Sequence, residues 1–256
     1  MKFEVVTSMN QSYYDNIGHK MLLSYIHKWP EDVKLRIYTE DNLVIPNSLH
    51  YKKYDLVHLE PELMKFVNRN KGRKDQQNPK ELHLGAVRFS YKTFSIINAC
   101  RTSRADYVIW LDADTFTHTS VTHEFLESLV NPDAYLTYLG RENNYSECGF
   151  VIYNVNHECN SNFMESWKKL YTTDNVFRLP QWHDSYVFDS LRRSFEDFHE
   201  ITNNNLSPWG KDYDHVFINS VLGEYMDHMK GDRKYEGKSK KSDLTRKVEA
   251  SYWRDL

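Results

Sequence analysis

The sequence has few cysteines, few prolines and little excess of charge of either sign. Its 256 residues include 3 Cys and 7 Pro, and the formal net charge at pH 7 is -3. An odd, small number of cysteines in no zinc or redox spacing favours a reducing compartment over a disulfide framework. The lack of a global basic excess argues against a nucleic-acid partner.

The sequence also lacks long hydrophobic runs. No apolar stretch approaches the roughly 18 residues of a membrane-spanning helix, so no membrane span is expected. The first seven residues are expected to form a strand rather than a signal peptide, and the expected location is cytoplasmic. Aromatic residues, in contrast, make up 14% of the chain, with 18 Tyr and 6 Trp. Their apolar faces and polar edges suit ligands such as sugars.

Strand and helix patterns alternate in the first part of the chain. Residues 2–7 (KFEVVT) and 34–39 (KLRIYT) are predicted strands. Between them, residues 14–26 carry apolar side chains at helical spacing, with Ser12 as a candidate cap and Trp29-Pro30 as the end. Strand, helix, strand is typical of an α/β fold with a parallel sheet.

The most hydrophobic strand signal is YVIWL at residues 107–111, which predicts a central strand covered on both faces. A helix is predicted before it over residues 82–100, and the polar stretch 70–80 (NKGRKDQQNPK) predicts a loop that could act as a lid. Further predictions are helices over 121–130, 162–171 and 181–192, strands over 135–139 and 150–153, and a late strand or buried segment over 216–221.

Two aspartates follow the central strand directly. Asp112 and Asp114 stand at i and i+2, so in an extended chain their carboxylates point the same way. Ligands collect at the carboxyl ends of such strands. Two adjacent carboxylates repel each other unless a cation lies beside them, and Mg²⁺ or Mn²⁺ shares oxygen ligands with substrate phosphates. The pair, with Ala113 between, therefore predicts a metal-diphosphate site.

Other phosphate-handling motifs fit less well. Haloacid-dehalogenase-like phosphatases also carry Asp-x-Asp after an apolar strand, but near the N-terminus and with Thr or Val where this chain has Phe116. Gly237-Lys238-Ser239 is not a P-loop, because the preceding glycine is one residue too far away and no strand precedes it.

A second motif lies downstream. His228, Gly231 and Lys234 form His-x-x-Gly-x-x-Lys. Imidazole is a good ligand for Mn²⁺, glycine lets the backbone turn close to phosphates, and a lysine ammonium stabilises a departing diphosphate.

With both motifs, the chain resembles GT-A-type glycosyltransferases, in particular the glycogenin and lipopolysaccharide galactosyltransferase group. The resemblance implies a GT-A (Rossmann-like) α/β fold with a mixed, mostly parallel sheet flanked by helices. It implies transfer, with retention, from a nucleotide-diphosphate sugar such as a UDP-sugar to a glycan or other hydroxyl acceptor. It implies Mn²⁺ (or Mg²⁺) bound by Asp112, Asp114 and His228, with Gly231 and Lys234 at the diphosphate. The family usually continues with Pro-Trp, whereas this chain has Tyr235-Glu236.

The resemblance also implies a division of one domain, residues 1–256. Residues 1–115 would form a nucleotide-binding half and residues 116–234 an acceptor-side half. Residues 235–256 would form a basic tail, either solvated or disordered until something binds.

Trp182-His183-Asp184 is similar to the Trp-His-Asp-Glu segment of blood-group and α-1,3-galactosyl transferases. Because Ser185 replaces the Glu of that family, a Glu-based double displacement is not implied. Asp184 shares a helical stripe with apolar residues and is predicted to face inward, where it would orient the donor sugar or support charge at the anomeric carbon. We therefore name Asp184 and Lys234 as catalytic candidates.

Four further residues are candidates for nucleotide binding. Thr7 ends the first predicted strand and Tyr13 follows it, where a base lies in this fold, and Tyr13 could stack on uracil. Arg88 and Lys92 are one helical turn apart and could face the nucleotide. Two other functions stay open: a nucleotide-sugar hydrolase or phosphatase that uses the same aspartates, and a non-catalytic nucleotide-sugar-binding protein.

Overall fold

The computed structural model describes residues 1–73 and 84–255. Its centre is a seven-stranded sheet in the order β3-β2-β1-β4-β7-β6-β8, in which only β7 runs antiparallel to its neighbours. This confirms the predicted mixed, mostly parallel sheet. The strands are β1 (Phe3–Met9), β2 (Lys34–Thr39), β3 (Tyr51–Asp55), β4 (Tyr107–Leu111), β6 (Leu136–Leu139), β7 (Glu147–Asn154) and β8 (Asn204–Asn205).

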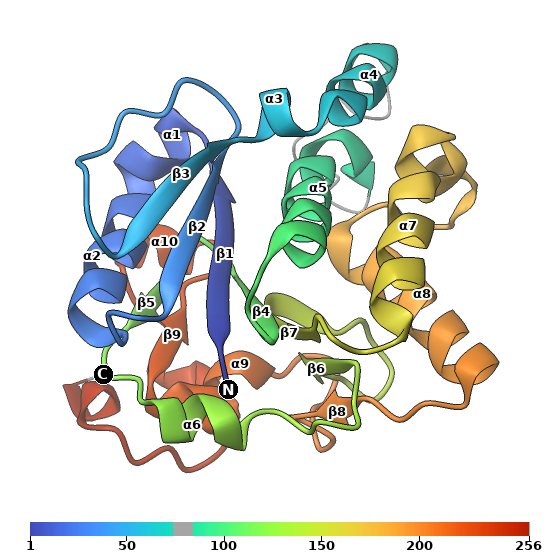
Figure 1. The fold of residues 1–256 in the computed structure, drawn as a ribbon. Helices are drawn as coiled ribbons and strands as arrows, with labels where there is room; N and C mark the ends of the chain where they lie inside the picture. Colours follow the sequence, from blue (N-terminus) through green and yellow to red (C-terminus); the bar gives the residue numbers. More distant parts are fainter. Residues whose placement is uncertain (74–83, 256) are drawn as a thin grey trace.

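Helices cover both faces of the sheet, as Figure 1 shows. Helix α2 lies on one face, and α5, α7 and α8 lie on the other. The helices are α1 (Gln11–Tyr13), α2 (His19–Lys28), α3 (Leu56–Leu59), α4 (Pro61–Asn70), α5 (Ala86–Thr102), α6 (His123–Ser128), α7 (Cys159–Thr172), α8 (Asp184–His199), α9 (Val216–Asn219) and α10 (Arg233–Glu236). A π-helical turn (Tyr14–Gly18) joins α1 to α2. Short 3₁₀ turns are found at Asn175–Arg178, Val221–Glu224, Lys241–Asp243 and Ser251–Asp255.

The buried core has two parts, one on each face. Successive side chains of a strand point to opposite faces. In β4, accordingly, Ile109 and Leu111 pack in the cluster that includes α2, whereas Val108 and Trp110 pack in the cluster that includes α5 and α7. All five residues of β4 are buried, which confirms the central, doubly covered strand.

One local prediction was wrong. The cap of the first helix is Asn10, whose Oδ1 accepts a hydrogen bond from the Tyr13 amide at 2.8 Å, and Ser12 lies inside the helix. Of the two alternatives for residues 216–221, the buried segment is the one observed, and it forms the short helix α9. The helix end before Trp29-Pro30 is confirmed, because α2 stops at Lys28.

Residues 40–69 received no prediction, yet they form β3, α3 and most of α4, which ends at Asn70, the predicted first residue of the loop. Strand β3 is at the edge of the sheet and has two exposed lysines, so its sequence lacks the apolar signal of a central strand. Residues 74–80 of the predicted lid loop lie outside the described residues. In the described part of the chain, no helix has the length and apolar character to cross a membrane.

A second, two-stranded sheet joins the middle of the chain to its C-terminal part. Strand β5 (Thr115–Thr117) pairs antiparallel with β9 (Met226–His228), and Thr115 stands opposite His228. This pairing places the downstream motif beside the two aspartates.

Candidate metal and diphosphate site

The aspartate pair stands where β4 ends. The Asp112 amide donates a hydrogen bond to the Gly149 carbonyl at 2.9 Å, and the Thr115 amide donates to the Asp112 carbonyl at 3.0 Å. The chain therefore leaves the sheet in a turn at Asp112. The Asp114 side chain is almost fully buried, whereas that of Asp112 is partly exposed.

Strand β9 brings His228 to the two carboxylates. Its Nε2 lies 3.2 Å from Asp114 Oδ1 and 3.6 Å from Asp112 Oδ2. One ligand atom from each of the three residues lies within 4.8 Å of the others. The Met229 amide extends the contact by donating to the Asp114 carbonyl at 3.0 Å. The structure thus brings together the three residues that the sequence predicted as metal ligands.

A glycine leaves room for the His228 imidazole. A Cβ atom built on Gly149 would lie 2.5 Å from His228 Cε1, which is closer than real Cβ contacts. Gly149 belongs to β7, which pairs with β4. The absence of a side chain at this position therefore positions the candidate ligand His228.

This close approach makes Gly149→Ala a test of the His228 position. We expect the added methyl group to displace the imidazole and to weaken Mn²⁺ binding by about 10–100-fold, as loss of a supporting contact does in metal sites. Mn²⁺ titration followed by electron paramagnetic resonance measures the affinity. Gly72→Ala is the matched control, since a Cβ there meets nothing within 4 Å. Equal Mn²⁺ affinities for the two variants would contradict the expected displacement.

Burial and neighbouring charges shift the pKa values of the two aspartates in opposite directions. Burial raises the pKa of the Asp112 carboxyl above its ordinary value, although Lys92 opposes this effect. Burial also raises the pKa of Asp114, but His228 and Lys234 outweigh it and hold the pKa well below the ordinary value. Lys234 Nζ lies 2.8 Å from Asp114 Oδ2.

Lys92 stands between two carboxylates. Its Nζ lies 2.9 Å from Asp112 Oδ1 and 2.7 Å from Asp184 Oδ2, and it donates to the Cys148 carbonyl at 2.7 Å. The Trp110 indole donates to the same Asp112 oxygen at 2.6 Å. Lys92 therefore fixes the acidic side chains, in addition to lining the cavity where the sequence predicted a nucleotide contact.

A cavity of about 260 Å³ lies beside the two aspartates, at the carboxyl ends of β1, β2 and β4. Thr7 does not line it, because its side chain is fully buried. The Thr7 Oγ1 atom has no hydrogen-bond partner among the described residues. Gly231 lies outside the lining too, in the turn before α10, with φ of 63°. The predicted residues that do line the cavity are Tyr13, Arg88, Lys92, Asp112, Ala113, Asp114, Asp184 and Lys234.

Asp184 is the first residue of α8, and His183 is its cap. The predicted inward orientation is observed, since the Asp184 carboxylate reaches Lys92 and lines the cavity. Tyr13 and Lys234 meet at another part of the lining, where Lys234 Nζ donates to the Tyr13 hydroxyl at 2.9 Å.

The site prediction missed two glutamates. Glu40 follows β2 directly and lines the cavity, where its Oε1 accepts a hydrogen bond from the Ser8 hydroxyl at 3.1 Å. Glu147 lies 3.5 Å from His228 Nδ1, 2.9 Å from Arg141 and in contact with Lys230. Position after a strand end, the argument used for Asp112, could have identified Glu40. Glu147 has no comparable sequence signal.

Burial raises the pKa of Glu40 to about 7 from an ordinary value of 4.5. Because the folded-state pKa is the higher one, Glu40 stabilises the fold below pH 4.5 and this contribution disappears as pH rises through 7. We expect wild type to lose about 1–3 kcal/mol of unfolding free energy relative to Glu40→Gln between pH 4.5 and 8, allowing for partial exposure. Urea denaturation across this pH range measures it. Glu31→Gln, at an exposed position, is the control. Parallel pH profiles for wild type and Glu40→Gln would contradict the expectation.

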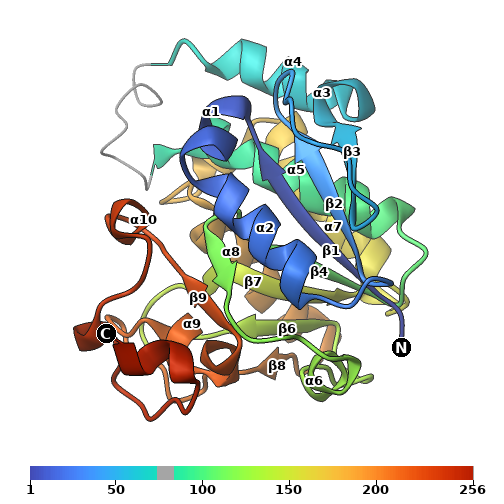
Figure 2. The same cartoon turned by 90° about the vertical axis from the view of Figure 1, so that its left-hand side faces the viewer.

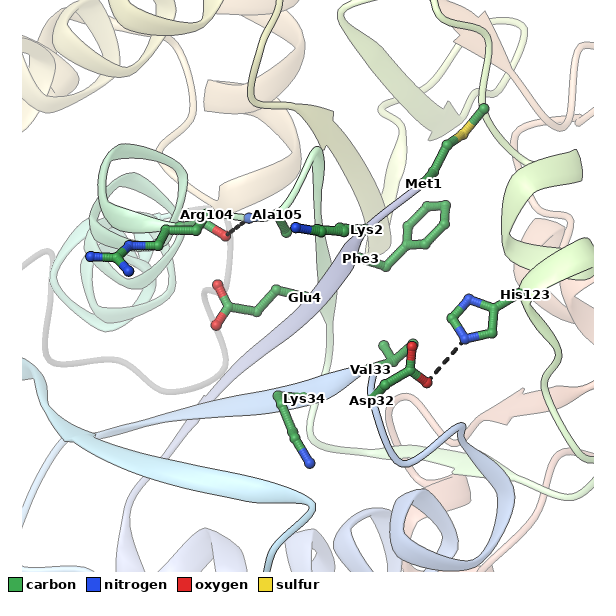
Figure 3. Close-up of a pocket in the computed structure, with 11 residues that line it drawn as sticks. Met1, Lys2, Phe3, Glu4, Asp32, Val33, Lys34, Arg104, Ala105 and His123 are labelled. Atoms are coloured by element: carbon green, nitrogen blue, oxygen red, sulfur yellow. Dashed lines mark hydrogen bonds and ion pairs between the residues drawn. The ribbon is translucent and has the colours of Figure 1, made fainter.

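A second cavity, of about 340 Å³, lies at the opposite end of the sheet (Figure 3). It is formed at the amino ends of β1 and β2, where Asp32 and His123 form an ion pair at 3.0 Å. Ligands of parallel sheets collect at the carboxyl ends, so we assign this cavity no function.

The chain resembles solved glycosyltransferases at low sequence identity. No protein-family model matches it, and no curated protein matches its sequence. It is similar to mouse xyloside xylosyltransferase 1, with a TM-score of 0.47 and 12% identity over 80% of this chain and 85% of that one. It is similar to the glycosyltransferase GlyE of Streptococcus pneumoniae TIGR4, with a TM-score of 0.43 and 16% identity over 77% of this chain and 44% of that one.

A third similar structure is a glycosyltransferase involved in the glycosylation of the major capsid of PBCV-1. Its TM-score is 0.44 and its identity 11%, over 93% of this chain and 97% of that one. We draw no functional conclusion from similarities of this size.

Proposed function

We propose that the protein is a metal-dependent glycosyltransferase. Its donor is a nucleotide-diphosphate sugar, in our proposal a UDP-sugar, its acceptor is a hydroxyl group on a glycan or other molecule, and the anomeric configuration is retained. One observation carries the proposal: Asp112, Asp114 and His228 converge within 4.8 Å, and Lys234 reaches Asp114 at the lining of the same cavity.

The three converging side chains fit a divalent metal ion. Two carboxylates and an imidazole form a donor set that suits Mn²⁺, and Mg²⁺ is the alternative. Asp112 and Asp114 line the cavity, which gives substrate phosphates access to the two carboxylates, whereas His228 is buried outside the lining. When bound, the ion would neutralise the phosphates and stabilise the negative charge of the leaving diphosphate.

The side chains of the chain itself supply position and charge. In the reaction, the bond from the anomeric carbon to the diphosphate oxygen breaks, a bond to the acceptor oxygen forms, and the proton of the acceptor hydroxyl goes to the departing diphosphate. Lys234 stabilises the charge that develops on the leaving diphosphate. Asp184 faces the cavity, and Lys92 holds its carboxylate in place. In this position the Asp184 carboxylate supports positive charge at the anomeric carbon. Tyr13 and Arg88 line the nucleotide side.

Product analysis tests this function. Wild-type protein is incubated with a panel of nucleotide-diphosphate sugars, Mn²⁺ and a mixture of hydroxyl acceptors, and the products are separated by mass spectrometry. Mn²⁺-dependent transfer of sugar to an acceptor supports the proposal, and nuclear magnetic resonance of the product gives the anomeric configuration. Release of free sugar or phosphate alone would favour the hydrolase or phosphatase. Nucleotide binding without turnover of any donor would favour the binding protein.

A further inference from the structure

The carboxylate of Asp227 has no role in the site described so far. Its side chain is fully buried. A buried carboxylate is costly unless hydrogen bonds compensate for lost water. Here the compensation comes from the C-terminal segment: Ser239 donates from its amide at 2.8 Å and from its hydroxyl at 2.6 Å, and the Tyr252 hydroxyl donates at 3.0 Å.

Asp227 and His228 are neighbours on β9, but their side chains point to opposite sides of the strand. Successive side chains of a strand point in opposite directions. His228 therefore faces the aspartate pair, while Asp227 faces the returning chain. Both residues depend on the same pairing with β5, in which Thr115 is opposite His228 and Phe116 is opposite Asp227.

The chain between these contacts forms a closed loop that carries Lys234. In Figure 2 the chain runs from β9 to α10 and then returns toward α9. It turns at Gly231, forms α10, turns again at Gly237 and reaches Asp227 at Ser239. Both glycines have positive φ, of 63° and 78°, which favours glycine over other residues.

Helix α10 cannot hold Lys234 in place by itself. It has four residues and none of them is buried, so neither helix length nor apolar packing stabilises it. Its fixed points are polar contacts: the Asp227–Ser239 pair at the base of the loop and the ion pair between Arg233 and Asp243. Lys234 itself contacts Asp114 and Tyr13, and Glu236 at the end of the helix pairs with Lys240 at an exposed position.

We propose that Asp227 is a positioning residue, which closes the loop of residues 228–239 and thereby holds the Lys234 ammonium over the diphosphate site. The inference rests on the proposed function for the identity of the ligand. Our inference that Asp227 closes the loop rests only on the hydrogen bonds between Asp227 and the C-terminal segment, and does not depend on the ligand. The segment after Ser239 is attached as well, since Asn219 accepts hydrogen bonds from the amides of Thr245 and Arg246.

Loop closure is tested first by limited trypsin digestion without ligand. The loop contains the cleavage sites Lys230, Arg233, Lys234 and Lys238. We expect Asp227→Ala to be cut within this loop at least about tenfold faster than wild type, because an open loop exposes backbone to the protease. Tyr252→Phe removes one of three hydrogen bonds and leaves Ser239 in place, so it serves as the matched control. Equal cleavage of Asp227→Ala and wild type would overturn the proposal.

Ligand positioning is tested by the affinities of UDP and uridine in the presence of Mn²⁺. A charge-assisted contact to a diphosphate corresponds to roughly 10–100-fold in affinity, and we expect both Asp227→Ala and Lys234→Ala to lose that much for UDP but not for uridine. Because both variants remove the same contact, that of the Lys234 ammonium with the diphosphate, the double variant should bind UDP no more weakly than Lys234→Ala. Asp227→Asn should recover most of the affinity, since its amide can still bond Ser239.

The outcomes separate the two proposals. Additive losses in the double variant, or an equal loss for uridine, would show that Asp227 acts on stability alone and would overturn its positioning role. If wild type binds no nucleoside diphosphate while Asp227→Ala still opens the loop to trypsin, the proposed function fails and loop closure stands. If wild type binds UDP and Asp227→Ala binds it equally well, only the positioning role fails.

Discussion

Asp114→Asn is expected to abolish Mn²⁺-dependent nucleotide binding and to lower the rate of sugar transfer by roughly 10²–10³-fold or more. The substitution removes one of two carboxylates from the candidate metal site and also the partner of Lys234 and His228. The amide carries no charge, so its carbonyl oxygen binds a hard divalent cation much more weakly than a carboxylate does. Rates with saturating donor, with and without Mn²⁺, measure the effect.

Two controls separate this result from misfolding. The thermal midpoint of Asp114→Asn without metal reports whether the variant folds, and Asp133→Asn removes a carboxylate from an exposed position. Undiminished Mn²⁺-dependent transfer by a folded Asp114→Asn variant would exclude Asp114 from the metal site.

Lys92→Met is expected to lower the free energy of unfolding by about 3–5 kcal/mol, which is the usual cost of removing one partner from a buried ion pair. The Lys92 side chain is 12% exposed and lies between Asp112 and Asp184. Burial lowers the pKa of its ammonium, but the two aspartates outweigh burial and the net pKa is raised. Without Lys92, two carboxylates of the site face each other uncompensated.

Urea denaturation at pH 7.5 measures the Lys92→Met effect. Lys169→Met is the matched control, because Lys169 is exposed on α7. A loss below about 1 kcal/mol, the range of surface pairs, would mean that Lys92 does not hold the two aspartates as the structure shows.

The sequence predicts those parts of the site that short motifs encode. Asp112 and Asp114 are two residues apart, and an apolar strand precedes them, so their shared direction follows from local geometry. His228 and Lys234 belong to a spaced motif whose residue types suit a metal and a diphosphate. The pairing of β5 with β9 that joins the two motifs was not predicted and is a finding of the structure.

Other parts depend on tertiary order and could not be predicted. Glu147 meets His228 because β7 is inserted antiparallel beside β4, and no local pattern encodes that strand order. Lys92 was predicted to face a nucleotide, but the orientation of α5 also places it between two carboxylates. The tail after residue 234 has a polar sequence, and its attachment depends on Asp227 and Asn219, which lie outside the tail.

The central claim is that Asp112, Asp114 and His228 hold a metal ion that binds a nucleoside diphosphate. A thermal-shift assay with a panel of nucleoside diphosphates, each with and without Mn²⁺, tests it most directly. At 100 times its dissociation constant a ligand adds about 2.7 kcal/mol to stability, which gives an easily measured shift. We predict stabilisation by one diphosphate, UDP, that requires Mn²⁺ and is absent in Asp114→Asn. No shift with any nucleoside diphosphate, or the same shift without metal, would contradict the claim.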